Sequence, residues 1–260
     1  MSKANHSDSA EYLAKKAAFA KLTTVYGRQA VREALLNHPD IRVVNLLLAS
    51  ELRPLVAEEF VTLAQSQGIT VKRMPQVNLS RITKNRSEDQ GVAADLDIQL
   101  VKPLGTWLQQ QQEGRLLAVV GVTTPGNIGI IARSVAAAGL AGLVVPQEGC
   151  PAPNLPLVIK ASAGYIFRTQ VFSVADWGEL LQLAQEANWP LIALDTGGER
   201  GSLFEHNSPP RALYLLGNES LGLPAELVKA SQEVLTIPLA AGVDSLNVAA
   251  AATLVAFAVR

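Results

Sequence analysis

The C-terminal stretch from Ala212 to Val259 constrains the fold of this chain more than any other. Two apolar runs within it, Leu213–Leu216 and Val234–Pro238, each lead into a loop of glycine and small polar residues. Continuous apolar runs of this length are typical of buried strands. In α/β proteins, ligands bind where such strands end in glycine-rich loops. The stretch therefore predicts a ligand site, but not the reaction that takes place there.

Strands and helices alternate upstream of this stretch, which predicts an α/β chain with two domains. We expect a polar leader over residues 1–22, a small α/β domain over 23–97, a linker over 98–114 and a larger domain over 115–260. In the larger domain we expect a parallel sheet covered by helices on both faces. Its predicted strands before Ala212 are Leu116–Val122, Leu143–Pro146, Thr169–Phe172 and Leu191–Asp195. Three linker residues are large and apolar enough to dock onto a neighbouring element: Leu104, Trp107 and Leu108.

Basic residues cluster in the smaller domain, although the whole chain has a net charge of −1. The cluster consists of Lys72, Arg73, Arg81, Lys84 and Arg86. A short basic patch binds phosphates even on a near-neutral protein, whereas an ordinary solvated face can have the same composition. Charge alone therefore leaves both interpretations open.

The composition argues against several classes of protein. Cys150 is the only cysteine and the chain has three histidines, which predicts no disulfide and no metal site. The first residues lack the apolar core of a signal peptide, so we expect a cytoplasmic protein. The apolar run Leu239–Val259 is interrupted by Asp244, Ser245 and Asn247, and the part after them is too short to span a bilayer. We expect a buried helix there rather than a membrane anchor.

Common active-site motifs of α/β proteins are absent from this sequence. No G-x-G-x-x-G follows the first strand of the larger domain, and neither G-x-x-x-x-G-K-[ST] nor G-x-S-x-G occurs. A dinucleotide site, a P-loop and an α/β-hydrolase nucleophile are therefore not expected.

Five polar residues instead lie in or just after the loops at strand ends: Asn127, Arg133, Glu219, Ser245 and Asn247. None is a good nucleophile or a neutral-pH base by itself, and the protonated guanidinium of Arg133 suits an anion such as phosphate. The set favours positioning two substrates for group transfer. Structural interpretations stay open: Ser245 or Asp244 as a helix cap, Asn127 as a turn residue, Arg133 as an exposed helix charge and Glu219 as a charge at a helix N-terminus.

Three blocks of the larger domain carry a family resemblance. PGNIGIIARSVAAAG, LLGNESLGLP and IPLAAGVDSLNVAAAATLVAF are similar to the signature motifs of the SpoU (TrmH-like) RNA 2′-O-ribose methyltransferases, a branch of the SPOUT superfamily. In the smaller domain, VYGRQAVREALL and LSRITKNRSEDQGVAA resemble the RNA-binding domain that precedes the catalytic domain in many members. The resemblance covers about residues 25–260.

The resemblance implies an α/β fold in which the parallel sheet carries a deep C-terminal trefoil knot, an exception to the rule that chains avoid knots. It implies that S-adenosylmethionine (SAM) binds in that knot, at Gly217, Asn218, Ile237, Leu239, Leu246 and Thr196. It also implies catalytic positions at Arg133, which acts from the partner subunit, and at Asn127, Glu219, Ser245 and Asn247. Arg28 is expected to join the basic cluster in gripping RNA.

The function that the resemblance predicts is SAM-dependent, metal-free methylation of a ribose 2′-oxygen in rRNA or tRNA by a homodimer. We expect the helix Ala249–Val259 at the dimer interface, with an ordinary core helix as the other interpretation. Many relatives carry an acidic residue and a larger residue where this chain has Thr124 and Gly126, which leaves target choice open. The alternative is a non-catalytic RNA-binding protein that retains the fold. An α/β enzyme acting on a small molecule would leave the smaller domain unexplained.

Overall fold

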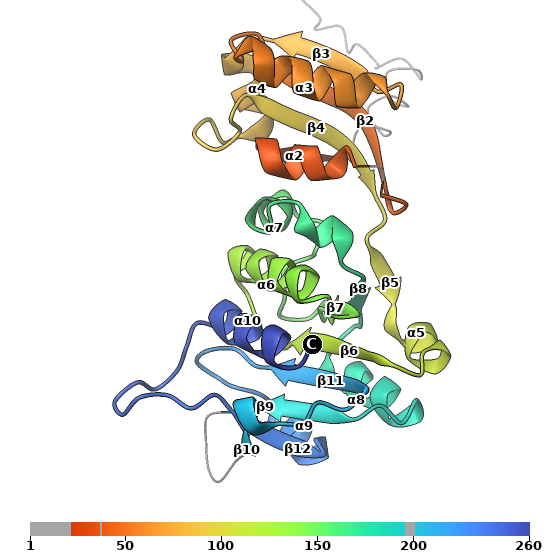
Figure 1. The fold of residues 1–260 in the computed structure, drawn as a ribbon, viewed down its shortest axis with the longest axis vertical. Helices are drawn as coiled ribbons and strands as arrows, with labels where there is room; N and C mark the ends of the chain where they lie inside the picture. The colour runs from red at the N-terminus through yellow and green to blue at the C-terminus, as the bar shows by residue number, and fades with distance from the viewer. Residues whose placement is uncertain (1–21, 37, 196–200) are drawn as a thin grey trace, which may run out of the picture.

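Two separate β-sheets organise the chain, one in each half of it (Figure 1). The computed structural model describes residues 22–36, 38–195 and 201–260. Among these residues the N-terminal sheet has four strands in the order β1-β4-β2-β3, and the C-terminal sheet has eight in the order β10-β12-β9-β11-β6-β7-β8-β5. The leader, apart from its last residue, and the candidate Thr196 lie outside the described residues.

The N-terminal domain is a mixed sheet with helices α2, α3 and α4 around it. Strand β4 pairs antiparallel with β1 and β2, and β2 pairs parallel with β3 after the crossover helix α3. Helix α3 packs on the sheet through Ala57, Phe60 and Ala64, whose spacing puts them on one helical face. The elements are β1 (Thr23–Tyr26), α2 (Arg28–Ala34), β2 (Ile41–Ala49), α3 (Pro54–Gln65), β3 (Thr70–Met74), α4 (Gln76–Thr83) and β4 (Val92–Ile98).

The C-terminal domain confirms the predicted parallel sheet, because every strand pair of its described residues is parallel. Its first elements are β5 (Val101–Pro103), α5 (Leu104–Gln110), β6 (Gly114–Val119), α6 (Pro125–Ala138), β7 (Gly142–Val144), α7 (Pro156–Ala161), η1 (Tyr165–Arg168) and β8 (Val171–Ser173). They are followed by α8 (Trp177–Glu186), β9 (Leu191–Leu194), β10 (Gly201–Ser202), η2 (Leu203–Glu205), β11 (Arg211–Leu216), α9 (Ala225–Ala230), β12 (Glu233–Thr236) and α10 (Val248–Ala258). The trefoil knot stays a prediction.

Helices cover both faces of this sheet, as the continuous apolar strands predict. On β6, Leu117 and Val119 pack into the core formed with α6, α7 and α10, whereas Leu116 and Ala118 pack into the core formed with α5, α8 and α9. Neighbouring strand residues point to opposite faces, so in a strand buried on both sides the successive side chains are all apolar. Figure 1 shows α6, α7 and α10 on the side of the N-terminal domain.

The segment 98–114, expected as a linker, contains the strand β5 and the helix α5. Strand β5 extends the C-terminal sheet by pairing with β8. The Trp107 ring lies 5.2 Å from the ring of Phe172 and 5.4 Å from that of Trp189, measured between centroids. Leu104 and Leu108 are buried beneath α5. A three-residue edge strand has too few residues to show a period in the sequence, whereas the docking of these apolar side chains was expected.

The two domains are in direct contact through α2 and the segment from α7 to η1. Gly164 has a φ of +81°, and a Cβ there would lie 2.6 Å from Cβ of Glu33 and 3.0 Å from Cα of Ala30. Only glycine allows that approach. Beside this contact, Nζ of Lys160 donates a hydrogen bond of 2.9 Å to the backbone oxygen of Glu88. The apolar core of the N-terminal domain is continuous with the core beneath α6.

Candidate functional site

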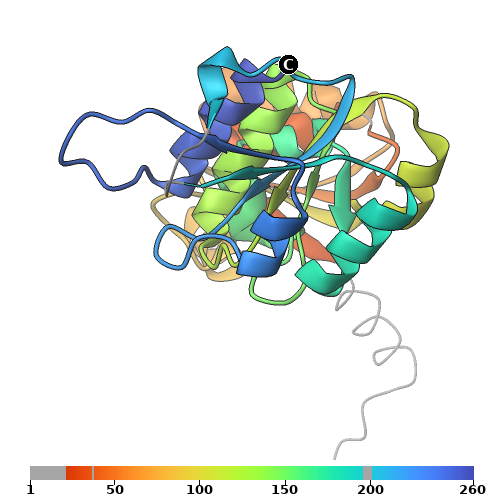
Figure 2. The same ribbon diagram turned by 90° about the horizontal axis from the view of Figure 1, so that it is seen from below.

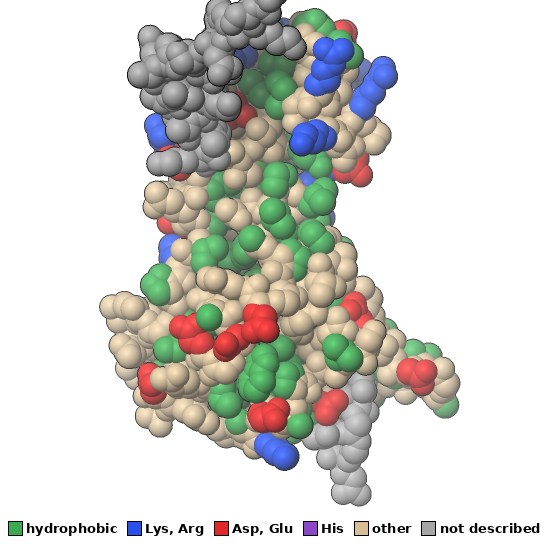
Figure 3. Space-filling view, turned by 180° about the vertical axis from the view of Figure 1, so that it is seen from behind, with side chains coloured by type: hydrophobic (Ala, Val, Ile, Leu, Met, Phe, Trp, Pro, Cys, Tyr) green, Lys and Arg blue, Asp and Glu red, His purple; other side chains and the backbone are tan. Residues whose placement is uncertain are grey.

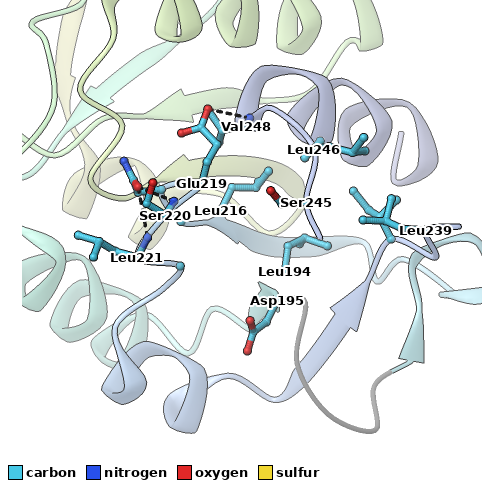
Figure 4. A pocket seen from close by; sticks show the side chains of 15 residues that line it. Leu194, Asp195, Leu216, Glu219, Ser220, Leu221, Leu239, Ser245, Leu246 and Val248 are labelled. Carbon is cyan, nitrogen blue, oxygen red and sulfur yellow. Dashed lines mark hydrogen bonds between the residues drawn. The ribbon is translucent and has the colours of Figure 1, made fainter. Parts of the chain in front are cut away.

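A cavity of about 310 Å³ lies at the carboxyl ends of β9, β11 and β12 (Figure 4). This volume is near the lower end of the range for small-molecule sites, and the location is the usual one for a parallel sheet. The cavity is formed by the end of β9, the loop after β11, and the segment from β12 into α10. Its lining residues are Leu194, Asp195, Leu216, Gly217, Asn218, Glu219, Ser220, Leu221, Gly222, Ile237, Leu239, Ser245, Leu246, Val248 and Ala251.

The cavity lining combines aliphatic side chains with two carboxylates. Figure 4 shows Leu194, Leu239 and Leu246 reaching the same space from three different segments of the chain. Asp195 and Glu219 bring their carboxylates to the cavity from the ends of β9 and β11. An apolar slot accepts an aromatic ring, while carboxylates accept hydrogen bonds from hydroxyl groups and favour a cationic group nearby.

The loop after β11 owes its shape to Asn218. The Asn218 Oδ1 atom accepts hydrogen bonds from the backbone N–H groups of Ser220, at 2.8 Å, and Leu221, at 3.3 Å. Its Nδ2 atom donates to the backbone oxygen of Gly121, at 2.9 Å, at the end of β6. The Asn218 backbone oxygen accepts from the N–H of Gly222, at 2.9 Å. Asn218 therefore lines the cavity, and its side chain bonds to the protein and holds the loop closed.

Gly217 lies where this loop folds back on itself. A Cβ at this position would lie 2.2 Å from the backbone carbon and oxygen of Gly222 and 2.5 Å from the backbone nitrogen of Leu223. Backbone atoms cannot move aside as a flexible side chain can. The residue is glycine because no other residue fits between the two arms of the loop.

Glu219 connects all three sequence motifs. Its Oε1 atom accepts hydrogen bonds from Nδ2 of Asn127 (3.2 Å), from Nδ2 of Asn247 (3.1 Å) and from the backbone N–H of Val248 (3.1 Å). Figure 4 shows the bond to Val248, at the N-terminus of α10. The carboxylate thus lies where the dipole of α10 favours negative charge. Through it, the start of α6, the loop after β11 and the start of α10 are fixed to one another.

The N-terminal cap of α10 is Asn247. Its Oδ1 atom accepts a hydrogen bond of 3.0 Å from the backbone N–H of Ala249. The interpretation that Ser245 or Asp244 caps this helix is therefore wrong. The helix begins at Val248, one residue before the expected Ala249, and Ser245 lies on the cavity lining. Figure 2 shows the segment between β12 and α10 projecting from the body of the domain.

Three of the predicted catalytic residues, Asn127, Arg133 and Asn247, do not line this cavity, and of these Arg133 has no hydrogen bond to Glu219. Arg133 is exposed on α6, and its Cζ lies 5.5 Å from the centroid of the Tyr165 ring in η1. Arg133 follows Asn127 by six residues, which places it about 240° around the helix and about 9 Å further along its axis. Within one chain, Arg133 and the cavity therefore face different directions.

Thr124 and Gly126 border a second groove of about 560 Å³ between the two domains. Its walls are the start of α6, part of α7 and the loop that leads into β4. The lining residues are Ser87, Glu88, Gln90, Thr124, Pro125, Gly126, Leu157, Lys160 and Ala161. The two positions that depart from the family pattern thus lie beside the N-terminal domain rather than in the cavity at the strand ends.

The predicted basic cluster is solvent-exposed on the N-terminal domain. Its members lie on β3 and α4 and in the loop after α4: Lys72, Arg73, Arg81, Lys84 and Arg86. Figure 3 shows Lys and Arg side chains on the upper, N-terminal domain and several Asp and Glu side chains on the C-terminal domain of the same face. Arg28 is half-buried, and its backbone N–H and Nε both bond to Gln90, so it shapes the loop before β4.

Asp195 is a charged residue of the cavity lining that the sequence analysis did not single out as a site residue. It directly follows the buried strand β9, and its backbone N–H bonds to the backbone oxygen of Leu235, at 3.0 Å, in β12. Its position at the carboxyl end of a predicted strand was a usable signal, since polar side chains at this edge of a parallel sheet face ligands.

The described ranges, 22–36, 38–195 and 201–260, contain neither a metal-binding cluster nor a membrane-spanning helix. Among these residues no group of three or more His, Cys, Asp or Glu side chains is arranged to hold a metal ion. None of the helices in the same ranges has the length and apolar character needed to cross a membrane.

The chain is similar to known proteins in sequence and in fold. A tRNA/rRNA methyltransferase of Mycobacterium avium, itself called uncharacterized, is 28% identical over 235 residues, which cover 89% of this chain and 75% of that protein. The crystal structure of the SpoU methyltransferase AviRb from Streptomyces viridochromogenes, in complex with the cofactor AdoMet (SAM), has a TM-score of 0.75 at 25% identity and covers 94% of this chain and 91% of its own. The crystal structure of an RNA 2′-O ribose methyltransferase has a TM-score of 0.75 at 22% identity. The match covers 96% of this chain and 91% of that chain.

Family models match both domains. The model for RNA 2′-O ribose methyltransferase substrate binding matches residues 24–99, and the SpoU rRNA methylase model matches residues 114–257. The second match alone covers more than half of the 260 residues. The chain therefore belongs to the SpoU rRNA methylase family of RNA methyltransferases, with a substrate-binding domain ahead of the catalytic domain.

Proposed function

We propose that this protein transfers a methyl group from SAM to a ribose 2′-oxygen in rRNA or tRNA. The observation that carries the proposal is the convergence of all three motifs, through the Glu219 carboxylate, beside a cavity at the carboxyl ends of the strands. The similar protein AviRb is a SpoU methyltransferase with AdoMet bound, and another similar structure is an RNA 2′-O ribose methyltransferase.

The cavity suits SAM by the chemistry of its walls. Ile237, Leu239 and Leu246 would hold the adenine between aliphatic side chains. Gly217 would let the backbone approach the cofactor, and the carboxylates of Asp195 and Glu219 favour a hydroxyl donor or a positive charge at the rim. When bound, SAM supplies an electrophilic methyl group on a cationic sulfur.

The chain's own residues then position the ribose. Asn127, Glu219 and Asn247 are held by mutual hydrogen bonds, so their orientation is fixed before RNA arrives. The guanidinium of Arg133 has hydrogen-bond donors and no acceptor, and it is therefore unsuited to act as a general base. Arg133 instead clamps a phosphate and polarises the 2′-oxygen, and the proton leaves late through phosphate or water.

The active site is completed by a second copy of the chain. Arg133 faces away from the cavity of its own protomer, so it acts on RNA bound at the partner's cavity. Helices α6 and α10 pack together, with Ser134 Oγ 2.7 Å from Thr253 Oγ1, and expose Ile130 (45%), Leu254 (37%) and Phe257 (43%). Apolar side chains exposed on two adjacent helices form a surface that suits an isologous dimer interface.

RNA reaches the site across the N-terminal domain. The exposed basic cluster would contact phosphates, and the groove beside Thr124 and Gly126 would lead the strand toward Asn127. Most of this affinity would be electrostatic and would fall as salt displaces the protein from the phosphates.

Replacing Arg81, Lys84 and Arg86 together by glutamine is expected to reduce the salt dependence of RNA binding. Each phosphate contact adds about 0.7 to 0.9 to the slope of log K against log salt, so the slope should fall by about 2. Fluorescence anisotropy at several salt concentrations measures it, with Lys229→Gln, an exposed cation on α9, as the control. An unchanged slope in the triple variant would remove the phosphate-binding role from this cluster.

Methyl transfer itself is tested with labelled SAM and total RNA. We expect label in RNA, at linkages that resist alkaline hydrolysis, because a methylated 2′-oxygen cannot attack the adjacent phosphodiester. Binding of SAM and RNA without transfer of label would contradict the proposal and favour the non-catalytic RNA-binding protein. Label in a small molecule would instead favour an enzyme that acts on a small-molecule substrate.

A further inference from the structure

The side chain of Tyr165 lies against two arginines. The Cζ of Arg133 is 5.5 Å from the centroid of its ring, and the Cζ of Arg168 is 5.1 Å from it. Both distances lie within the range of a cation–π interaction. Tyr165 is half-buried at the start of η1, and Arg133 projects from α6, so the ring connects two separate elements of the catalytic domain.

Arg168 is in turn held by the N-terminal domain. Its Nε lies 2.7 Å from Oε2 of Glu33, and its Nη2 lies 3.0 Å from Oε1, which makes a bidentate ion pair. The Glu33 side chain is only 3% exposed, and Gln29 Nε2 donates a further hydrogen bond of 3.3 Å to Oε1. A planar pair of this kind fixes the direction of the guanidinium as well as its position.

Glu33 also determines which of the two arginines the Tyr165 ring stabilises. Two guanidinium groups against one ring repel each other, and the repulsion is strongest where neither charge is neutralised. Glu33 neutralises Arg168, so the face of the Tyr165 ring can stabilise Arg133. The contact of Gly164 with Glu33 and Ala30 holds the start of η1 against α2. It thereby keeps Tyr165 and Arg168 close to Glu33.

We propose that Tyr165, Arg168 and Glu33 are positioning residues for Arg133, so that docking of the RNA-binding domain orients the arginine. The proposal rests on the function proposed above for Arg133. Because Arg133 acts at the partner's cavity, the substrate-binding domain of one protomer prepares the active site of the other.

The first test compares Tyr165→Leu with Tyr165→Phe, which keeps the ring. We expect Tyr165→Leu to lower kcat about fivefold to tenfold, the size of one cation–π contact, with Tyr165→Phe within about twofold of the original protein. Glu33→Gln is expected to lower kcat to a similar extent. The affinity for SAM should change little, because none of these residues lines the cavity. Wild-type kcat in Tyr165→Leu would overturn the inference.

The second test measures the environment of the Arg133 side chain by NMR and does not depend on catalytic activity. In the full-length protein, the NMR signal of the Arg133 Nε–Hε group is identified by its loss in Arg133→Lys. A ring above a guanidinium shifts this signal, so we expect it to move in Tyr165→Leu and Glu33→Gln and to stay in Tyr165→Phe. An unmoved signal in both variants would overturn the inference. If the original protein transfers no methyl group to RNA, the proposed function fails, while this signal still decides whether Tyr165 and Glu33 hold Arg133.

Discussion

Replacing Arg133 by lysine is expected to lower turnover at least about a hundredfold while the affinity for SAM stays within about twofold. Lysine keeps the positive charge but loses the planar fork that binds phosphate through two donors, and losing one well-placed stabilising donor typically costs a factor of about 100 to 1,000. SAM binding should be spared because Arg133 lies outside the lining of its own chain's cavity. Single-turnover methyl transfer and calorimetry with SAM measure the two quantities separately.

Arg42→Lys is the matched control for this change. Arg42 is exposed on β2 of the N-terminal domain, pairs with Asp97 at 3.0 Å, and lies far along the chain from the three motifs. Its turnover should stay within about twofold, since a surface ion pair contributes at most about 1 kcal/mol. If SAM affinity and turnover fall in parallel in Arg133→Lys, the arginine contacts the cofactor. That result would contradict the proposal that Arg133 acts at the partner's cavity.

Replacing Gly217 by alanine is expected to weaken SAM binding at least about a hundredfold and to destabilise the fold. The added Cβ would lie 2.2 Å from backbone atoms of Gly222, so the two arms of the loop must separate. Overpacking of this kind costs about 1 to 3 kcal/mol, and an opened loop no longer presents its backbone to the cofactor. Calorimetry with SAM and denaturant unfolding without SAM measure the two effects.

Gly126→Ala provides the control for the same chemical change. At Gly126 a Cβ would meet only Cγ2 of Thr124, at 3.9 Å, which is ordinary contact. Alanine in the first turn of α6 should leave stability equal or slightly higher, because it favours helix over glycine. SAM affinity should not change. Normal SAM binding by Gly217→Ala would show that the loop adapts to the added Cβ. It would contradict the proposal that glycine is needed here for the backbone to approach the cofactor.

The parallel sheet and the cavity were predictable from the sequence because local composition determines them. Runs such as Leu213–Leu216 are apolar on every residue, which is typical of a strand buried on both faces. The carboxyl ends of parallel strands lie at one edge of the sheet, so the loops after β11 and β12 were expected at the same edge, although β9 lies between the two strands. Glu219 and Asn247 follow those strands, and they meet through a hydrogen bond of 3.1 Å.

Contacts between distant parts of the chain could not be predicted in the same way. Glu33 and Arg168 are 135 residues apart, and nothing near either residue indicates the other. The direction of Arg133 depends on how α6 is rotated against α7, which packing determines rather than the local sequence. The exact start of α10 was missed because Asp244, Ser245 and Asn247 are all good caps, and only the geometry selects Asn247.

The position of β5 determines where this chain can be divided. Strand β5 is the last strand on one side of the C-terminal sheet, and it pairs with the outer edge of β8. A fragment beginning at residue 115, where composition suggests the catalytic domain starts, would leave that edge with unpaired backbone groups, which invites pairing between copies. Recombination of the catalytic half with another substrate-binding domain therefore needs a junction upstream of Val101, so that the strand travels with the sheet it protects.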